Sequence, residues 1–286
     1  LQREIATRGW NACAMNFRGC GHVPMTTPRS YHAAYTGDIR CVVQQLSSRM
    51  AYNNVPIFLI GNSLGANVVT KYLGEEGLAG SLPECVAGGI SLGNPLLFYS
   101  DNINFPFNVG MGMARKATYL EHWHAIKNMN DFAWQTAKRK GLLSITLGQL
   151  DKAAAPLMIR NDPYPPFSTK IGYESGYDYW MDSGCYEMMR FISIPFLMVS
   201  AEDDFLCYQS TQRCLGYALS NPNIMLVETQ TGGHLGWQER SPNKGSGSLF
   251  DSSSWSDVAS AEFIDATLKT RAGKASNDAQ RDIPDM

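Results

Sequence analysis

The sequence predicts an α/β fold in which helices cover both faces of a mostly parallel sheet. Apolar segments of strand length alternate with segments of helical spacing along most of the 286 residues. This alternation is typical of parallel sheets, because successive parallel strands need a crossover, which is usually a helix. About a hundred residues of different character follow the third strand, too many for a loop, and they indicate an inserted subdomain.

The elements of the core follow from local patterns. The expected strands are short apolar runs bounded by turn residues: 10–17, 56–60, 86–92, 194–201 and 224–228. The expected helices carry apolar residues at helical spacing: 35–50, 66–76, 208–219 and 258–271. Gly77 is the expected stop of the second helix, and Gly93-Asn94-Pro95 ends the third strand.

Composition divides the chain into three parts. The core is expected over residues 1–94 and 191–271, and the insert over residues 95–190. The insert is rich in Met, Tyr, Trp and Phe, with helices expected over 118–128 and 130–140 and a proline-rich turn at 162–166. It fits a packed subdomain or a lid with an apolar tunnel equally well. Residues 244–254 and the polar tail, 272–286, are expected to be flexible.

Charge and cysteine content exclude several functions. The 24 basic and 26 acidic residues give a net charge of −2, which lacks the basic excess of a nucleic-acid-binding protein. The longest strongly apolar run, 55–60, is far too short to span a membrane. The seven cysteines form no C-x-x-C pair, so we expect buried or half-buried free thiols in a reducing, intracellular compartment.

The pattern Gly-x-Ser-x-Gly, typical of a nucleophile elbow, occurs around Ser63 and around Ser91. An elbow needs a buried strand, a tight turn with small flanking residues, and a helix directly behind it. Ser63 has this context, since a strand precedes it, glycines flank it and a helix follows. Ser91 is followed by Asn94-Pro95, and the residue before a proline leaves the helical region. Ser91 is therefore expected to lie at the end of a strand.

A nucleophilic serine needs a histidine base that a carboxylate orients. Around such an elbow, the three residues follow in the order serine, acid, histidine. His234 fits this order, because it lies in a glycine-rich stretch after the last strand. The other histidines precede Ser63 or lie in the insert, ahead of any acid that follows the fourth strand: His22, His32, His122 and His124.

The acid is expected directly after strand 194–201, where three carboxylates adjoin: Glu202, Asp203 and Asp204. Asp204 is favoured, because a turn after Ser200 would first direct a carboxylate back to the site at this position. Asp203 and Glu202 remain alternatives.

His122 and His124 invite a metal interpretation. Residues two apart on a helix point to different faces and do not chelate one ion together. We therefore expect neither a metal nor a cofactor.

Five motifs follow one another along the chain: NFRGCG at 16–21, GNSLGAN at 61–67, YLGEEG at 72–77, AEDDF at 201–205 and GGHLGW at 232–237. Together they resemble the YheT/EMB8-like branch of the α/β-hydrolases, over residues 3–270. That branch includes the mammalian α/β-hydrolase domain proteins 1, 2 and 3 and the yeast medium-chain ethyl ester synthases. The resemblance implies an α/β-hydrolase fold with a lid, and catalytic roles for Ser63, Asp204 and His234.

The chain departs from the family pattern at two positions, where Asn62 replaces an aromatic residue and Phe205 replaces a proline. Neither change removes the triad, although each is placed to alter the pocket. The backbone N–H of Leu64 is one expected oxyanion donor. The resemblance implies that the second donor, on a His-Gly loop, lies ahead of Leu1 together with the first strands, where family members often carry a membrane anchor as well.

The sequence thus predicts a serine hydrolase whose partner is a small-molecule acyl ester or lipid. Members of the family cleave carboxylic esters or transfer medium-chain acyl groups to alcohols. Acyl transfer by the same triad is therefore one alternative. The other is a catalytically inactive binding protein with a hydrolase fold, because the resemblance places the second oxyanion donor outside the residues of this chain.

Overall fold

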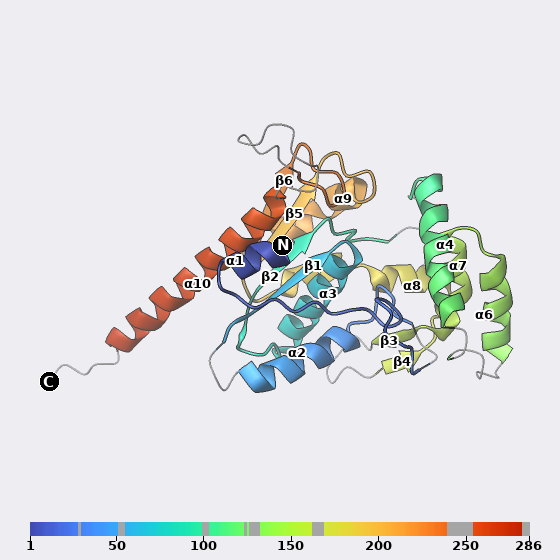
Figure 1. Cartoon of the computed structure of the whole chain (residues 1–286), viewed down its shortest axis with the longest axis horizontal. Helices are drawn as coiled ribbons and strands as arrows, with labels where there is room; N and C mark the ends of the chain where they lie inside the picture. The colour runs from blue at the N-terminus through green and yellow to red at the C-terminus, as the bar shows by residue number, and fades with distance from the viewer. Residues whose placement is uncertain are drawn as a thin grey trace.

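The computed structural model describes residues 1–27, 30–50, 55–98, 103–122, 125, 132–161, 169–238 and 254–281. Within these ranges, four parallel strands form the main sheet in the order β1-β2-β5-β6 (Figure 1). Their bounds are β1 Ile57–Asn62, β2 Val86–Leu92, β5 Phe196–Ala201 and β6 Ile224–Thr229. Four of the five predicted strands are therefore confirmed.

The prediction of a strand over residues 10–17 is wrong. This segment pairs with no strand in the described part of the chain, and residues 11–16 are exposed. Its alternation of apolar and polar residues resembles a strand, but a strand is stable only when its backbone groups pair with a neighbour. The two aromatic ends, Trp10 and Phe17, instead pack against the clusters on opposite faces of the sheet.

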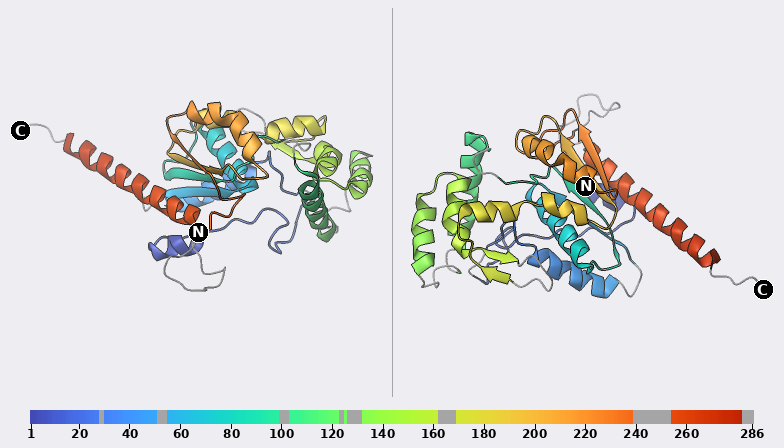
Figure 2. Two further views of the ribbon diagram at one scale, coloured as in Figure 1. Left: turned by 90° about the horizontal axis from the view of Figure 1, so that it is seen from above. Right: turned by 180° about the vertical axis from the view of Figure 1, so that it is seen from behind.

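Helices cover both faces of the sheet, as Figures 1 and 2 show. On one face lie α2 Gly37–Met50, α3 Leu64–Ala79 and α9 Tyr208–Leu219. On the other lie α1 Gln2–Thr7 and α10 Trp255–Arg281. Within the described chain, no helix has both the length and the apolar character needed to cross a membrane.

Alternate side chains of β5 enter two separate buried clusters. Phe196 and Met198 pack with residues of α2, α3 and α9, whereas Leu197 and Val199 pack with Ile264 of α10. Every residue of β2 and β5 is buried. Strands buried on both faces consist of continuous apolar runs, and such runs, bounded by turn residues, located these strands in the sequence.

Two helices are longer than predicted. Helix α3 continues past Gly77 and ends at Gly80, which has φ 64°. A Cβ at Gly77 would overlap the carbonyl oxygen of Phe191, so this glycine permits close packing and is not a helix stop. Helix α10 continues to Arg281, through most of the predicted tail. Residues 272–281 contain no proline, and extending an existing helix costs little.

The inserted residues lie beside the sheet (Figure 1). They form α4 Phe105–Glu121, α6 Phe132–Leu143, α7 Leu147–Ala154, η3 Ala155–Leu157, the antiparallel pair β3 Ile159–Asn161 and β4 Thr169–Ile171, α8 Gly176–Ser183 and η4 Tyr186–Phe191. The helix predicted over 118–128 overlaps only the end of α4 in the described chain, whereas the one predicted over 130–140 corresponds to α6. The predicted turn at 162–166 and all but the last residue of the predicted flexible stretch, 244–254, lie outside the described residues.

The seven cysteines all lie within the described ranges and are free thiols. Cys13 and Cys41 are exposed, which corrects the expectation that all would be buried or half-buried. The remaining five are partly or fully buried.

Candidate active site

Ser63 lies in the sharp turn between β1 and α3, with φ 51° and ψ −120°. A positive φ is uncommon outside glycine and marks a strained backbone. A Cβ at Gly61 would overlap the backbone of Gly65 and Ala66, so the turn requires a glycine two residues before the serine. A Cβ at Gly65 would meet no described atom outside its own helix within 4 Å. Steric crowding by the backbone therefore explains why residue 61 is a glycine, but it does not explain why residue 65 is one.

Ser63, His234 and Asp204 are joined by hydrogen bonds. Ser63 Oγ lies 2.7 Å from His234 Nε2, and His234 Nδ1 lies 3.0 Å from Asp204 Oδ2 and 3.2 Å from Oδ1. In this geometry the serine hydroxyl donates to Nε2, while Nδ1–H donates to the carboxylate. The backbone N–H groups of Leu206 and Cys207 donate to Asp204 Oδ1 at 2.9 and 3.0 Å. These two bonds hold the Asp204 carboxylate in the position from which it accepts the hydrogen bond of His234.

The turn after β5 separates the three adjoining carboxylates. The N–H of Asp204 donates to the carbonyl of Ala201, and this turn buries the Asp204 side chain beside His234. Glu202 and Asp203 are exposed. Asp203 Oδ1 accepts the N–H of Gly233 at 2.7 Å, so Asp203 holds the loop that carries His234.

The loop that carries His234 is stabilised by its own backbone. Gly233 has φ 59°, and the carbonyl of Gly232 accepts the N–H groups of Gly236 and Trp237. Trp237 donates its indole N–H to Thr229 Oγ1 at 2.9 Å, which ties the loop to the end of β6.

The other candidates lie elsewhere. Ser91 is fully buried in β2, where its hydroxyl accepts a hydrogen bond from Asn94 Nδ2 at 2.9 Å. This agrees with the expectation that Ser91 lies in a strand. His22 is exposed, and His122 Nε2 lies 2.9 Å from the carbonyl oxygen of Gly19. His124 lies outside the described residues.

Comparison with known proteins gives the family. Residues 1–239 match the family described as alpha/beta hydrolase fold. The chain belongs to the α/β-hydrolase family. The embryogenesis-associated protein EMB8 of Picea glauca is 27% identical to it over 268 residues, 93% of this chain and 54% of the relative. The resemblance to the EMB8-like branch is thus confirmed.

Two further relatives of this α/β-hydrolase carry descriptive names. A monoacylglycerol lipase of Saccharomyces cerevisiae is 30% identical over 238 residues, which cover 83% of this chain and 50% of the relative. The solved structure of a Paleococcus ferrophilus monoacylglycerol lipase has a TM-score of 0.49 at 14% identity, with 93% of this chain and 88% of that chain covered. The chain spans about half the length of the curated relatives it matches.

Ser63 of this α/β-hydrolase opens into a cavity of about 640 Å³ between the core and the insert. Ser63, Leu64 and Asp204 line its core side. On the insert side, α4, α7 and α8 contribute Met111, Ala114, Arg115, Leu147, Asp151 and Trp180, and parts of the segments 31–33, 95–98, 103–104 and 202–210 complete the wall. Leu64 is the first residue of α3, so its backbone N–H has no acceptor within that helix.

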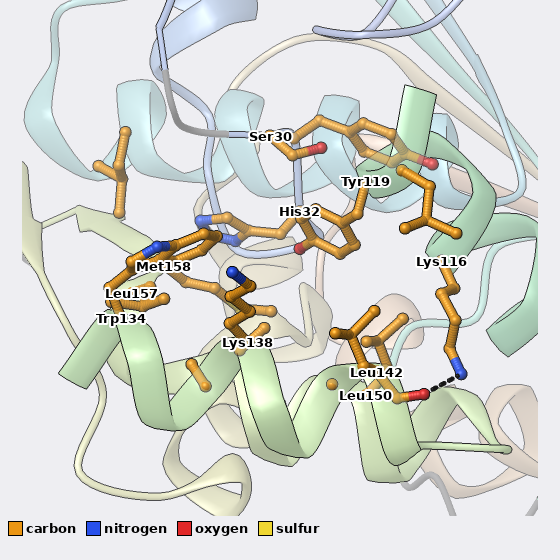
Figure 3. A pocket seen from close by; sticks show the side chains of 16 residues that line it. Ser30, His32, Lys116, Tyr119, Trp134, Lys138, Leu142, Leu150, Leu157 and Met158 are labelled. Carbon is orange, nitrogen blue, oxygen red and sulfur yellow. Dashed lines mark hydrogen bonds between the residues drawn. The ribbon is translucent and has the colours of Figure 1, made fainter. Parts of the chain in front are cut away.

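A second cavity, of about 90 Å³, shares Tyr31 and His32 with the first (Figure 3). Its lining is mostly apolar: Trp134 and Leu142 of α6, Leu150 of α7, and Met158 after η3 are among its residues, together with residues of α4. The Lys116 ammonium group, in the same wall, donates to the carbonyl of Leu142 at 3.0 Å.

Sequence reasoning missed the polar side chains on the insert side of the large cavity. Burial, with a smaller effect of the Arg115 charge, lowers the pKa of His32 to about 3, so its imidazole is neutral. Burial raises the pKa of Asp151 to about 6. No sequence motif marks these two residues, because they come from segments that are far apart in the sequence.

Cys207 is a further neighbour of the triad. Its Sγ lies 3.6 Å from His234 Nδ1. Asp204, Cys207 and His234 each offer a possible metal-binding atom within 4.8 Å of the others. Burial and the nearby Asp204 carboxylate raise the pKa of the Cys207 thiol. The hydrogen bonds from Ser63 to His234 and from His234 to Asp204 already use both ring nitrogens of His234, as a serine-histidine-aspartate triad requires.

Proposed function

We propose that this α/β-hydrolase chain carries the catalytic centre of a carboxylic ester hydrolase that acts on lipid-derived acyl esters. The observation that carries the proposal is the hydrogen-bonded series from Ser63 through His234 to Asp204, placed in the wall of a large cavity. A serine hydroxyl becomes an effective nucleophile when a base within hydrogen-bond distance takes its proton.

In the proposed reaction, Ser63 Oγ bonds to the ester carbonyl carbon while His234 Nε2 takes the hydroxyl proton. Asp204 stabilises the imidazolium that forms. The tetrahedral intermediate then expels the alcohol, which takes the proton from His234 and leaves an acyl ester on Ser63. His234 takes a proton from the water that attacks this ester and returns it to Ser63 Oγ as the acyl–oxygen bond breaks, which releases the carboxylic acid and restores the serine.

The developing oxyanion needs a hydrogen-bond donor beside Ser63. We assign this role to the backbone N–H of Leu64, because it lies at the start of α3, where free N–H groups and the helix dipole favour negative charge.

Two features support a lipid-derived substrate. Apolar side chains from both parts of the chain line much of the cavity, among them Leu64 and Phe205 of the core and Phe98, Met111 and Leu147 of the insert. The yeast relative is named a monoacylglycerol lipase, and its name agrees with this chemistry.

We assign the insert, residues 95–190, the role of a lid. Phe107 of α4 stacks on Phe205, the residue after Asp204, with ring centroids 4.4 Å apart. This contact joins the insert to the turn that carries the triad acid. Phe205, one of the two departures from the family pattern, therefore packs the insert against this turn.

Ester hydrolysis by three matched proteins tests the proposal. The wild-type full-length protein is expected to cleave a medium-chain p-nitrophenyl ester, and Ser63→Ala to lower kcat roughly 10⁴-fold or more. Ser91→Ala should keep nearly the wild-type rate, because Ser91 lies inside the sheet. Equal losses in both variants would show that the wrong serine was assigned.

The same assay separates hydrolysis from acyl transfer. With ethanol present, a hydrolase is expected to release mainly the free acid, whereas an acyltransferase would release mainly the ethyl ester. Ethyl ester as the main product, dependent on Ser63, would replace water with an alcohol as the acyl acceptor.

A further inference from the structure

The corner between α6 and α7 exposes basic and large apolar side chains together (Figure 1). Near the end of α6, Arg139 and Lys140 are exposed. Three large apolar side chains follow within five residues and are exposed as well: Leu142 by 49%, Leu143 by 77% and Ile145 by 60%. Leu143 has the highest exposed fraction of any large apolar side chain that the structure describes. We refer to residues 139–145 as the α6–α7 corner.

The carbonyl groups of the α6–α7 corner accept hydrogen bonds from within the protein. The ammonium group of Lys116, in α4, donates to the carbonyl of Leu142 at 3.0 Å and to that of Ser144 (Figure 3). Ser144 donates its hydroxyl to the carbonyl of Lys140 at 2.9 Å and its N–H to that of Gly141 at 3.2 Å. The corner is therefore a held turn in which Ser144 is buried and its two neighbours point outwards.

The start of α7 completes this bonding. The N–H of Ile145 donates to Gln149 Oε1 at 2.8 Å, and the N–H of Gln149 donates to Thr146 Oγ1 at 3.2 Å, which forms a capping box. A backbone group that enters lipid must have a partner within the protein, because lipid chains offer no hydrogen bonds. The backbone groups named here have such partners, so the corner can enter a lipid headgroup region without leaving them unsatisfied.

The charge around the corner differs from that of the rest of the chain. Residues 105–154, from α4 to α7, contain seven basic and three acidic residues, a net charge of +4. The whole chain carries −2, so the remaining residues carry −6. A positive segment on a negative protein is attracted to an anionic surface in one preferred orientation. The dipole of α6 favours a cation near the helix end, but it does not account for the exposed apolar residues that follow.

We propose that the α6–α7 corner docks the protein on an anionic phospholipid surface. Leu142, Leu143 and Ile145 enter the headgroup region, and Arg139 and Lys140 bind the lipid phosphates beside it. Basic residues next to exposed apolar ones bind in the plane of such a surface. A stable protein interface uses about 20–30 residues a side, so a corner of this size fits a lipid surface better than an acidic protein.

This docking goes beyond the proposed function, because it needs no catalysis. It also gives the insert a use outside the cavity. Helices α4 and α7 flank the corner and supply part of the cavity wall, with Met111 and Ala114 from α4 and Leu147 from α7. A corner docked on lipid would therefore place the cavity of Ser63 close to the lipid phase.

Vesicle binding by the full-length protein tests the docking. The wild type is expected to bind vesicles that contain phosphatidylserine at least about 10-fold more tightly than vesicles of phosphatidylcholine alone. The double variant Arg139→Gln/Lys140→Gln should weaken binding to the anionic vesicles about 10-fold or more, and Leu143→Ser about 5-fold. Ser63→Ala should bind like the wild type, because docking does not use the nucleophile.

Two control proteins carry the same changes elsewhere on the surface. The double variant Arg213→Gln/Lys269→Gln removes two exposed positive charges from α9 and α10, and Leu219→Ser removes a leucine that is 72% exposed. Both should bind the anionic vesicles within about 2-fold of the wild type. Equal weakening by the corner and control variants would overturn the docking, since net charge or general apolarity would then account for the binding.

A fluorophore at the corner reports docking without regard to what other parts of the protein bind. The fluorescence that Leu143→Trp adds to the wild-type signal is expected to be quenched by brominated lipid chains in the anionic vesicles. The fluorescence that Leu219→Trp adds should persist. Persistence of both would overturn the docking.

Two further outcomes are decisive. Tighter binding of the corner to polyglutamate than to anionic vesicles would make it a protein-docking surface and would overturn the lipid assignment. A protein that docks but cleaves no ester would contradict only the proposed reaction, whereas one that cleaves esters but does not dock would contradict only the docking.

Discussion

Ser63 and His32 both occupy positions that are locally unfavourable. Ser63 has a positive φ, at a typical cost of about 1–3 kcal/mol, and His32 is buried with unsatisfied ring nitrogens. Such local costs are expected at functional positions. The sequence reveals Ser63, because the small residues of the elbow surround it. It does not reveal His32, whose burial depends on Tyr173 and Tyr179 from the far end of the insert.

His32 makes the fold sensitive to acid. Its pKa is about 3 in the folded state and about 6.5 in an unfolded chain. Below pH 6.5 the unfolded chain therefore binds a proton that the folded protein does not, and stability falls as the pH falls towards 3. Between pH 7 and pH 5 this group lowers the free energy of unfolding by about 2 kcal/mol.

His32→Phe should remove that loss, which urea unfolding at the two pH values can measure. The raised pKa of Asp151 makes the folded protein more stable as the pH falls, which is the opposite of the His32 effect. Asp151 is present in both the variant and the wild type, so its contribution cancels in the comparison. The same pH dependence in the variant and the wild type would contradict a neutral buried His32.

Helix α3 shows how an element depends on a distant partner. Its glycines, Gly74 and Gly77, lie so close to η4 that a Cβ at either would overlap a backbone carbonyl oxygen, of Met188 or Phe191. The helix pattern was predictable from the local sequence. The reason for these glycines was not, because η4 lies at the far end of the insert, more than a hundred residues later in the chain.

Gly77→Ala is therefore expected to lower the free energy of unfolding by roughly 1–3 kcal/mol, although alanine is the better helix former. Gly216→Ala in α9 is the control. A Cβ at Gly216 would meet no described atom within 4 Å outside its own helix, so this substitution should stabilise the protein by about 0.5–1 kcal/mol. Chemical denaturation of the two variants checks both signs, and stabilisation by Gly77→Ala would contradict the close packing of α3 on η4.

For the whole molecule, the order of motifs predicted the arrangement well. Parallel strands place their carboxyl ends at one edge of the sheet, so residues after β1, β5 and β6 were expected to meet there, and Ser63, Asp204 and His234 do. Features that depend on pairing between distant segments were not predictable. Residues 10–17 have a strand-like pattern without a described partner strand, and the polar residues His32, Arg115 and Asp151 of the cavity wall come from three segments.

The central claim is that Ser63 is the nucleophile, and an active-site-directed fluorophosphonate tests it most directly. After reaction of the folded full-length protein, mass spectrometry of its peptides is expected to place one adduct on Ser63. The adduct should be absent from Ser63→Ala and retained in Ser91→Ala. An adduct on Ser91, or a folded wild-type protein that forms none, would contradict the account.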